Sequence, residues 1–209
     1  MENLLKYENE LKQEGFKIIG GTDEAGRGPL IGPVVAACVV LPVNYQNDNI
    51  NDSKKLTEKK REELYDVIVK DALSIGIGIV DAPLIDEINI YEASRLAMKK
   101  AYEEAKSNIK IEYLLTDAMP LDLEIPVTKI IKGDSKSITI AAASIIAKVT
   151  RDRMLIELDK KYPMYGFKSH KGYPTKKHIE AIHKYGLIDG YRKTYSPIKE
   201  IIKEEKWKI

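Results

Sequence analysis

Apolar residues recur along the chain in two periods, one typical of strands and one typical of helices. Short apolar runs that end in glycine, proline or charged residues predict five strands. These strands span Lys17–Asp23, Val34–Leu41, Ser74–Val80, Glu112–Leu115 and Val127–Ile131. Apolar residues at helical spacing predict helices over residues 2–14, 57–71, 83–107 and 138–149.

The order of these elements predicts an α/β fold, with a mixed sheet, flanking helices and a C-terminal helical extension. The link between the first two strands is short. Because a parallel crossover needs a dozen or more residues, these two strands are expected to be antiparallel. The helix over 138–149 is rich in alanine, which lets a helix lie close to a sheet, so we place it centrally.

Length and composition fit one folding unit, because 209 residues that are 44% hydrophobic can bury a proper core. We divide it into an N-terminal helical segment (1–16), an α/β core (17–160) and a basic, aromatic C-terminal helical extension (161–209). The net charge is only +2, so a nucleic-acid partner would have to meet a local basic face. The chain shows no signal-peptide core and no apolar span of roughly 20 residues, so we expect a cytoplasmic protein without a membrane partner.

Acidic residues stand at the ends of three predicted strands: Asp23 with Glu24, then Asp117, then Asp134. Ligands gather at the carboxyl ends of strands in open α/β sheets. If the three strands are neighbours, four carboxylates converge, and a pair of divalent cations relieves their repulsion. All-oxygen ligands favour Mg²⁺ or Mn²⁺ over zinc. Two such ions about 3.5–4 Å apart hydrolyse phosphodiesters.

Each of these residues has a simpler explanation when it is taken alone. Neighbouring side chains of a strand point to opposite faces, so Asp23 and Glu24 share a target only if the strand ends or bulges there. Asp134 alone fits the N-cap of the helix that follows, and Asp117 alone fits a turn. The joint occurrence of the acids at strand ends favours the metal site.

Several segments in register closely resemble the bacterial ribonuclease HII family. They are Gly21–Pro29, Asn51–Leu56, Thr116–Ala118, Lys132–Ser137, Ala141–Asp152 and Ser169–Thr175. The similarity runs from about residue 17 to 195. It implies a ribonuclease H-like five-stranded sheet in which strands 1–3 are antiparallel and strands 4 and 5 are parallel to strand 1.

The resemblance also implies endonucleolytic cleavage of the RNA strand of RNA–DNA hybrids. It further implies a cut 5′ of single ribonucleotides in duplex DNA, leaving a 3′-hydroxyl and a 5′-phosphate. The implied catalytic metal ligands are Asp23, Glu24, Asp117 and Asp134, with two Mg²⁺ or Mn²⁺ ions as cofactors. Residues expected to sense the ribose 2′-hydroxyl are Gly26, Arg27, Gly28 and Tyr173. Residues expected to bind phosphates are Ser53, Lys54, Lys55, Lys136, His170 and Lys171, within a basic surface that includes residues 168–193.

Two other functions remain open at this point. A nuclease of related fold that acts on branched DNA would need no 2′-hydroxyl sensor. A non-enzymatic nucleic-acid-binding module would use the acids only structurally. We expect a monomer whose partners are RNA–DNA hybrids and ribonucleotide-containing duplex DNA. Residues 1–16 and 201–209 match nothing in the resemblance, and the tail lacks the glutamine-and-aromatic pattern of a sliding-clamp ligand.

Overall fold

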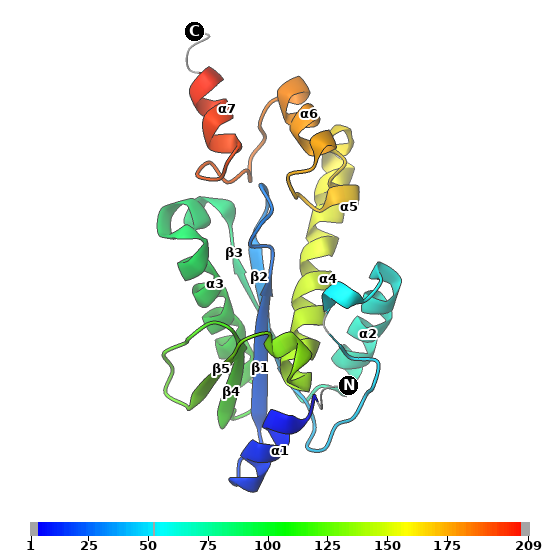
Figure 1. The fold of residues 1–209 in the computed structure, drawn as a ribbon, viewed down its shortest axis with the longest axis vertical. Helices are drawn as coiled ribbons and strands as arrows, with labels where there is room; N and C mark the ends of the chain where they lie inside the picture. The colour runs from blue at the N-terminus through cyan, green and yellow to red at the C-terminus, as the bar shows by residue number, and fades with distance from the viewer. Residues whose placement is uncertain (1–3, 52, 206–209) are drawn as a thin grey trace.

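A mixed five-stranded sheet forms the centre of the protein (Figure 1). The computed structural model describes residues 4–51 and 53–205. The strands are β1 (Ile19–Ala25), β2 (Val34–Val40), β3 (Ser74–Val80), β4 (Tyr113–Asp117) and β5 (Val127–Ile130). Their order is β3-β2-β1-β4-β5. The first three are antiparallel neighbours, and β4 and β5 run parallel to β1, which confirms the predicted sheet.

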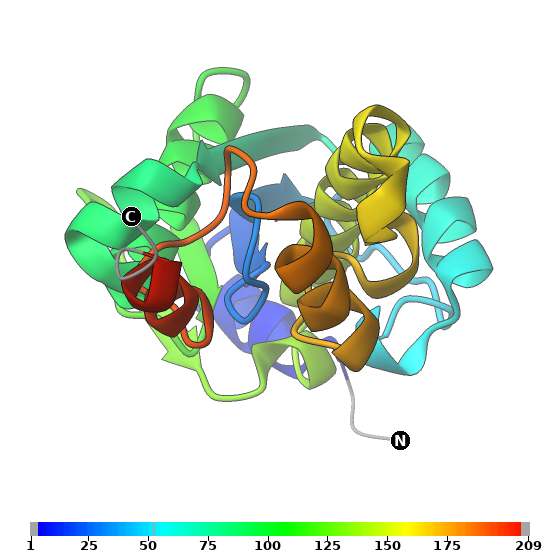
Figure 2. The same ribbon diagram turned by 90° about the horizontal axis from the view of Figure 1, so that it is seen from above.

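Helices cover both faces of this sheet, as the turned view shows (Figure 2). On one face α3 (Ala82–Lys106) packs against β2 and β3. On the other face α4 (Ile138–Lys161) packs against β1 and β2, and α2 (Glu58–Asp71) packs against α4. Every residue of β2 is buried because both of its faces are covered. Burial also raises the pKa of the Cys38 thiol to about 12, so this cysteine is an inert core residue.

Two helices differ from their predictions. The predicted helix over 138–149 continues to Lys161, because Leu155 and Leu158 extend its apolar side and pack against the C-terminal residues. The prediction ended it where the composition turned basic. The predicted helix over 83–107 is interrupted at Asn89, whose φ is 67°. Its Oδ1 accepts hydrogen bonds from the backbone N–H groups of Tyr91 and Glu92, so Asn89 caps the second half.

The C-terminal helices surround the turn between β1 and β2 at one end of the sheet (Figure 1). They are α5 (Phe167–His170), α6 (Lys176–Tyr185) and α7 (Ile198–Glu205). Leu30 of the turn is joined to this region twice, because its N–H donates to Gly172 O (2.8 Å) and its carbonyl accepts from Arg192 N (2.8 Å). The extension therefore fixes the turn that follows Asp23 and Glu24.

At the opposite end of the sheet lies α1 (Lys6–Gln13), within the predicted helix over 2–14. Asp52 of the Asn51–Leu56 motif and the ends of the predicted 1–16 and 161–209 segments, residues 1–3 and 206–209, lie outside the described residues. Among the helices that are described, none combines the length and the apolar character needed to cross a membrane.

Candidate active site

Three aspartates from separate segments meet at one edge of the sheet. Asp23 lies in β1, Asp117 ends β4, and Asp134 lies in a short 3-10 turn (Gly133–Ser135) after β5. Each of the three offers a carboxylate oxygen, and these oxygens all lie within 4.8 Å of one another. They converge because β1, β4 and β5 are parallel neighbours whose carboxyl ends share an edge.

Polar contacts hold two of these carboxylates in place. The backbone N–H of Gly133 donates to Asp117 Oδ1 at 2.7 Å, which ties the β5 turn to β4. Lys54 Nζ lies 3.1 Å from Asp134 Oδ2. Ser137, and not Asp134, is the N-cap of α4, because its Oγ accepts from the Ile140 N–H. The N-cap explanation for Asp134 is therefore wrong.

Glu24 is not one of the three residues whose oxygens lie within 4.8 Å of one another. The predicted strand over Lys17–Asp23 is displaced in the structure, where β1 runs from Ile19 to Ala25, so Asp23 and Glu24 are both inside it. Consecutive strand residues point to opposite faces of a sheet, so the continuation of β1 past Asp23 does not by itself bring the two carboxylates to one target. Glu24 still lines the same cleft, and its Oε1 lies 3.4 Å from Arg27 Nη1. Its Oε2 is buried and has no hydrogen-bond partner among the described residues.

Burial and neighbouring negative charges disfavour the charged forms of Asp23 and Glu24. The pKa of Asp23 is raised well above its ordinary value by burial, and further by the charges of Glu24 and Asp117. Burial raises the pKa of Glu24 to about 7, and the charge of Asp117 adds to this while Arg27 opposes it. Carboxylates held in this way gain a large stabilisation from a bound cation. The oxygen-only donor set suits a hard divalent ion.

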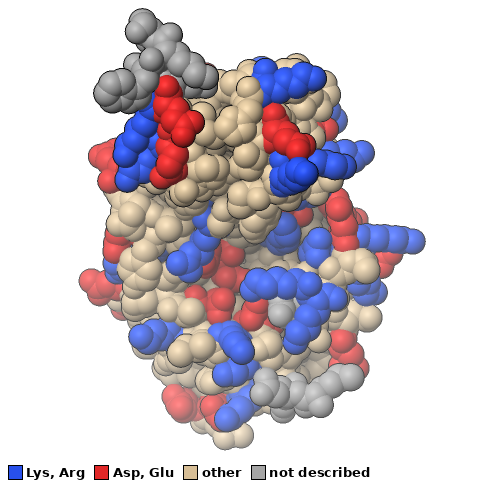
Figure 3. All heavy atoms as spheres, turned by 45° about the horizontal axis from the view of Figure 1, so that its top comes forward, with Lys and Arg blue, Asp and Glu red and all other residues tan. Residues whose placement is uncertain are grey.

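The cleft around the acids combines glycines, small polar side chains and cations. Its lining residues are Asp23, Glu24, Ala25, Gly26, Arg27, Gly28, Ser53, Lys54, Asp117, Ser144, Lys148 and Tyr173. One face of the molecule carries acidic side chains at its centre with lysines and arginines around them (Figure 3). This pattern agrees with the contacts of Arg27 and Lys54, which lie beside two of the acids.

A buried arginine orients the Gly26–Gly28 turn. Arg192 is 0% exposed and donates to Gly26 O (Nη2, 2.6 Å) and to Arg27 O (Nη1, 2.8 Å). The carbonyl and the N–H of a trans peptide point in opposite directions. The N–H groups of Arg27 and Gly28 therefore point away from Arg192. Gly26 has a φ of 99°, and a Cβ there would lie 2.1 Å from Arg151 Nε, so only glycine fits.

The sequence interpretation missed the role of these arginines. Arg192 falls in the 168–193 region that was expected to bind the nucleic-acid backbone at the surface, and for this residue the surface placement is wrong. Arg151 is also buried and donates to the carbonyls of Ile31, Pro33 and Lys171. Nothing in the local sequence separates them from surface cations. Ser144 and Lys148 were missed too, although their i,i+4 spacing on α4 was a usable signal.

Tyr173 lies at the rim of the cleft, with its ring beside Gly28. It is 41% exposed, and a Cβ on Gly28 would lie 3.4 Å from its Cε1. Two histidines hold its backbone: Tyr173 N donates to His170 O (2.9 Å), and His178 Nδ1 lies 2.8 Å from Tyr173 O. Burial lowers the pKa of His178 to about 4, so it is neutral and its Nδ1–H is the donor.

The residues expected to bind phosphates fall into two groups. Ser53 and Lys54 line the cleft. Lys55 follows Lys54 in the chain and is exposed, and Lys136 lies two residues after Asp134 and is half-buried. His170 and Lys171 are instead engaged within the protein. His170 Nε2 lies 2.9 Å from Tyr165 O, and Lys171 Nζ contacts Glu58 Oε1 (3.2 Å) and Lys168 O (2.8 Å).

The sheet order and the clustered aspartates together define an enzyme of the ribonuclease H-like class. Solved structures agree: ribonuclease H2 from Pyrococcus horikoshii covers 90% of this chain and 99% of its own, at 29% identity and a TM-score of 0.75. In the PCNA:RNase HII complex from Archaeoglobus fulgidus, the matching chain covers 86% of this one and 95% of its own, at 28% identity and a TM-score of 0.69. The protein family described as Ribonuclease HII matches residues 20–196.

A curated ribonuclease HII from Bacillus mycoides is 56% identical over 199 residues, which is 95% of this chain and 77% of that protein. A curated ribonuclease HII from Bacillus cytotoxicus is also 56% identical, over 96% of this chain and 76% of its own. The chain belongs to the ribonuclease HII family, and it is an endoribonuclease that acts on RNA–DNA hybrids. The expected family and fold are thereby confirmed.

Proposed function

We propose that this enzyme cuts the RNA strand of RNA–DNA hybrids and also cuts on the 5′ side of single ribonucleotides embedded in duplex DNA. The products would carry a 3′-hydroxyl and a 5′-phosphate. The observation that carries this proposal is the convergence of Asp23, Asp117 and Asp134 beside the Gly26–Gly28 turn and Tyr173. A metal site for phosphodiester hydrolysis and a recognition site for one sugar would then share a single cleft.

Asp23, Glu24, Asp117 and Asp134 would hold two Mg²⁺ or Mn²⁺ ions. The raised pKa values of Asp23 and Glu24, and the buried Glu24 Oε2 with no partner among the described residues, support this assignment. Such ions supply an activated water and stabilise the leaving oxygen of a phosphodiester. The protein's part would be to hold the carboxylates at a fixed spacing.

The Gly26–Gly28 turn and Tyr173 would recognise the ribose 2′-hydroxyl, the group that distinguishes RNA from DNA at a single nucleotide. Arg192 supports this role, because it engages the carbonyls of the turn and directs the intervening N–H groups away from itself. Hydroxyl oxygens accept from such N–H groups, and the Tyr173 phenol can donate or accept. The ring of Tyr173 could also pack on a sugar.

Ser53, Lys54, Lys55 and Lys136 would contact phosphates without reading sequence. The internal contacts of His170 and Lys171 favour a different role for these two residues, which is to hold the loop that carries Tyr173. We propose that the enzyme acts on its duplex as a monomer.

Three duplexes of one sequence test the proposal: all DNA, DNA with one ribonucleotide, and an RNA–DNA hybrid. Each is incubated with Mg²⁺ or Mn²⁺, and the cut positions are read on a sequencing gel. We expect one cut 5′ of the lone ribonucleotide, several cuts in the hybrid and none in all-DNA duplex. Cleavage of all-DNA duplex would support the branched-DNA nuclease instead, and binding without cleavage under either metal would support a non-enzymatic module.

For Tyr173→Phe, cutting at a lone ribonucleotide should slow by about 10- to 100-fold, because one hydrogen bond to a polar substrate group is lost. Single-turnover rates on the one-ribonucleotide duplex measure this effect. The exposed Lys99→Ala, on α3 across the sheet, is the control and should cut at the wild-type rate. Equal rates for Tyr173→Phe and Lys99→Ala would remove Tyr173 from sugar recognition.

A further inference from the structure

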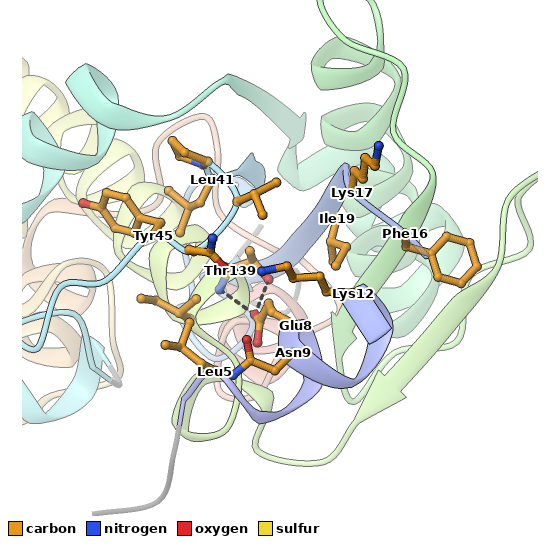
Figure 4. A pocket seen from close by; sticks show the side chains of 14 residues that line it. Leu5, Glu8, Asn9, Lys12, Phe16, Lys17, Ile19, Leu41, Tyr45 and Thr139 are labelled. Atoms are coloured by element: carbon orange, nitrogen blue, oxygen red, sulfur yellow. Dashed lines mark hydrogen bonds between the residues drawn. The ribbon is translucent and has the colours of Figure 1, made fainter. Parts of the chain in front are cut away.

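Glu8 of α1 is bonded to the first turn of α4 (Figure 4). Its Oε1 accepts three hydrogen bonds: from Ser137 Oγ at 2.6 Å, from Thr139 N at 3.1 Å and from Thr139 Oγ1 at 2.9 Å. Its Oε2 is buried and has no hydrogen-bond partner among the described residues. A carboxylate placed here satisfies a backbone N–H that the helix itself leaves open, and it interacts favourably with the helix dipole.

The segment that Glu8 holds adjoins two of the proposed metal ligands through the turn after β5. Asp134 lies in this turn (Gly133–Ser135), three residues before Ser137 at the start of α4. Ser137 N donates to Gly133 O at 2.9 Å, and Gly133 N donates to Asp117 Oδ1 at 2.7 Å. A shift of Ser137 would therefore move the turn of Asp134 and the partner of Asp117 together.

The same segment also adjoins the strand that carries Asp23. Gly21 lies against the α4 backbone so closely that a Cβ on it would be 2.3 Å from the carbonyl carbon of Thr139. Asp23 follows two residues later and points to the same face of β1 as Gly21. The first turn of α4 therefore adjoins the positions of all three clustered aspartates.

Apolar contacts anchor α1 to the same elements. Leu11 is 7% exposed and belongs to a buried cluster with Ile19 of β1, Leu115 of β4, Ile130 of β5 and Ile140 of α4. These are the three strands that lead to the aspartates and the helix that follows Asp134. In addition, the backbone N–H of Ile138 donates to Leu4 O at 2.8 Å.

We infer that Glu8 is a positioning residue, which fixes the start of α4 and through it the spacing of Asp23, Asp117 and Asp134. Glu8 lies outside residues 20–196, the part that the family profile matches, so the inference gives a role to a segment that the family resemblance leaves unassigned. It rests on the proposed metal site. A residue that only stabilised the fold would lower the unfolding temperature without changing metal affinity.

Mn²⁺ binding to the protein without nucleic acid, measured by calorimetry, separates these two roles. Glu8→Ala removes the acceptor of three hydrogen bonds, and we expect it to weaken Mn²⁺ binding by about 10-fold or more, the range for residues that orient metal ligands. Glu8→Gln keeps an oxygen acceptor and should lose less Mn²⁺ affinity than Glu8→Ala. Glu10→Ala, an exposed glutamate of the same helix, is the matched control and should bind as wild type.

Two further measurements on the metal-free and loaded protein accompany the calorimetry. Amide hydrogen exchange of residues 137–140 should be faster in metal-free Glu8→Ala than in Glu10→Ala, because the first turn of α4 opens more often. In activity assays kcat should fall while the KM for the duplex stays constant, because the lost contact lies away from the phosphate-binding lysines.

Thr139→Val keeps the inference testable if Glu8→Ala fails to fold, because it removes one hydroxyl donor and conserves the shape of the side chain. It should weaken Mn²⁺ binding in the wild type and have a smaller effect in the Glu8→Gln background. The inference is overturned if folded Glu8→Ala binds Mn²⁺ with wild-type affinity. It is also overturned if Glu8→Gln and Thr139→Val both do. Asp134→Asn serves as the reference, because unchanged Mn²⁺ binding in that variant would instead overturn the proposed metal site.

Discussion

Asp134→Asn is expected to lower turnover by more than about 100-fold while the fold and duplex binding are retained. Replacing a residue that only orients a metal ligand lowers metal affinity or activity by about 10- to 100-fold, so replacing a direct ligand should lower activity by more than that. The fold should survive because asparagine has nearly the same shape. The ion pair that is lost, with Lys54, involves a side chain that is 77% exposed and contributes at most about 1 kcal/mol.

Single-turnover cleavage of the one-ribonucleotide duplex, together with a binding titration and thermal unfolding, measures this prediction. Asp122→Asn makes the same chemical change at an exposed position five residues after Asp117. It should match wild type in cleavage rate, duplex affinity and unfolding temperature. Unchanged turnover in Asp134→Asn would remove Asp134 from catalysis. A joint loss of turnover and unfolding temperature would assign it a structural role.

The second large effect concerns the stability of the metal-free protein as a function of pH. Burial, with the charge of Asp117, raises the pKa of Glu24 from 4.5 to about 7 in the folded protein. Below pH 4.5 the Glu24 carboxyl is protonated in both the folded and unfolded states, so it does not change the free energy of unfolding there. Between pH 4.5 and 7 it ionises first in the unfolded chain. The free energy of unfolding therefore falls as pH rises through this window, by on the order of 3 kcal/mol.

Urea unfolding in the presence of a chelator, at pH 5 and at pH 8, measures this effect. The wild type should lose more stability between the two pH values than Glu24→Gln, in which position 24 cannot ionise. Glu87→Gln, an exposed change on α3, should keep the wild-type difference. Adding Mn²⁺ at pH 8 should restore stability to the wild type, because the ion binds the charged carboxylates. Identical pH dependence in wild type and Glu24→Gln would show that Glu24 is not held at a raised pKa.

The sheet and the three aspartates could be predicted from the sequence because their signals are local. The short link before Val34 required an antiparallel pair, and Asp117 and Asp134 each follow an apolar run that reads as a strand. That these strands are parallel neighbours, which brings their ends together, was implied only by the family resemblance, and the sheet order confirms it. Whether Asp23 and Glu24 share one target could not be predicted, because it depended on whether the strand ends or bulges at Asp23. The polar residues and glycines there suggested an end, but pairing with β2 continues to Ala25.

The supports of the site could not be predicted, because they are made by residues far apart in the chain. Arg192 reaches the carbonyls of Gly26 and Arg27 across more than 160 residues, and its sequence neighbours resemble a surface segment. Glu8 reaches Ser137 across 129 residues. A side chain that pairs with backbone carbonyls or with a helix start leaves no periodic pattern, so only the fold reveals it.

Anomalous diffraction from crystals soaked in Mn²⁺ tests the central claim most directly. The account predicts at least one manganese peak in direct contact with carboxylate oxygens of Asp23 and Asp117, at the cluster completed by Asp134. Manganese bound only elsewhere, or no peak at this edge of the sheet at saturating Mn²⁺, would contradict it.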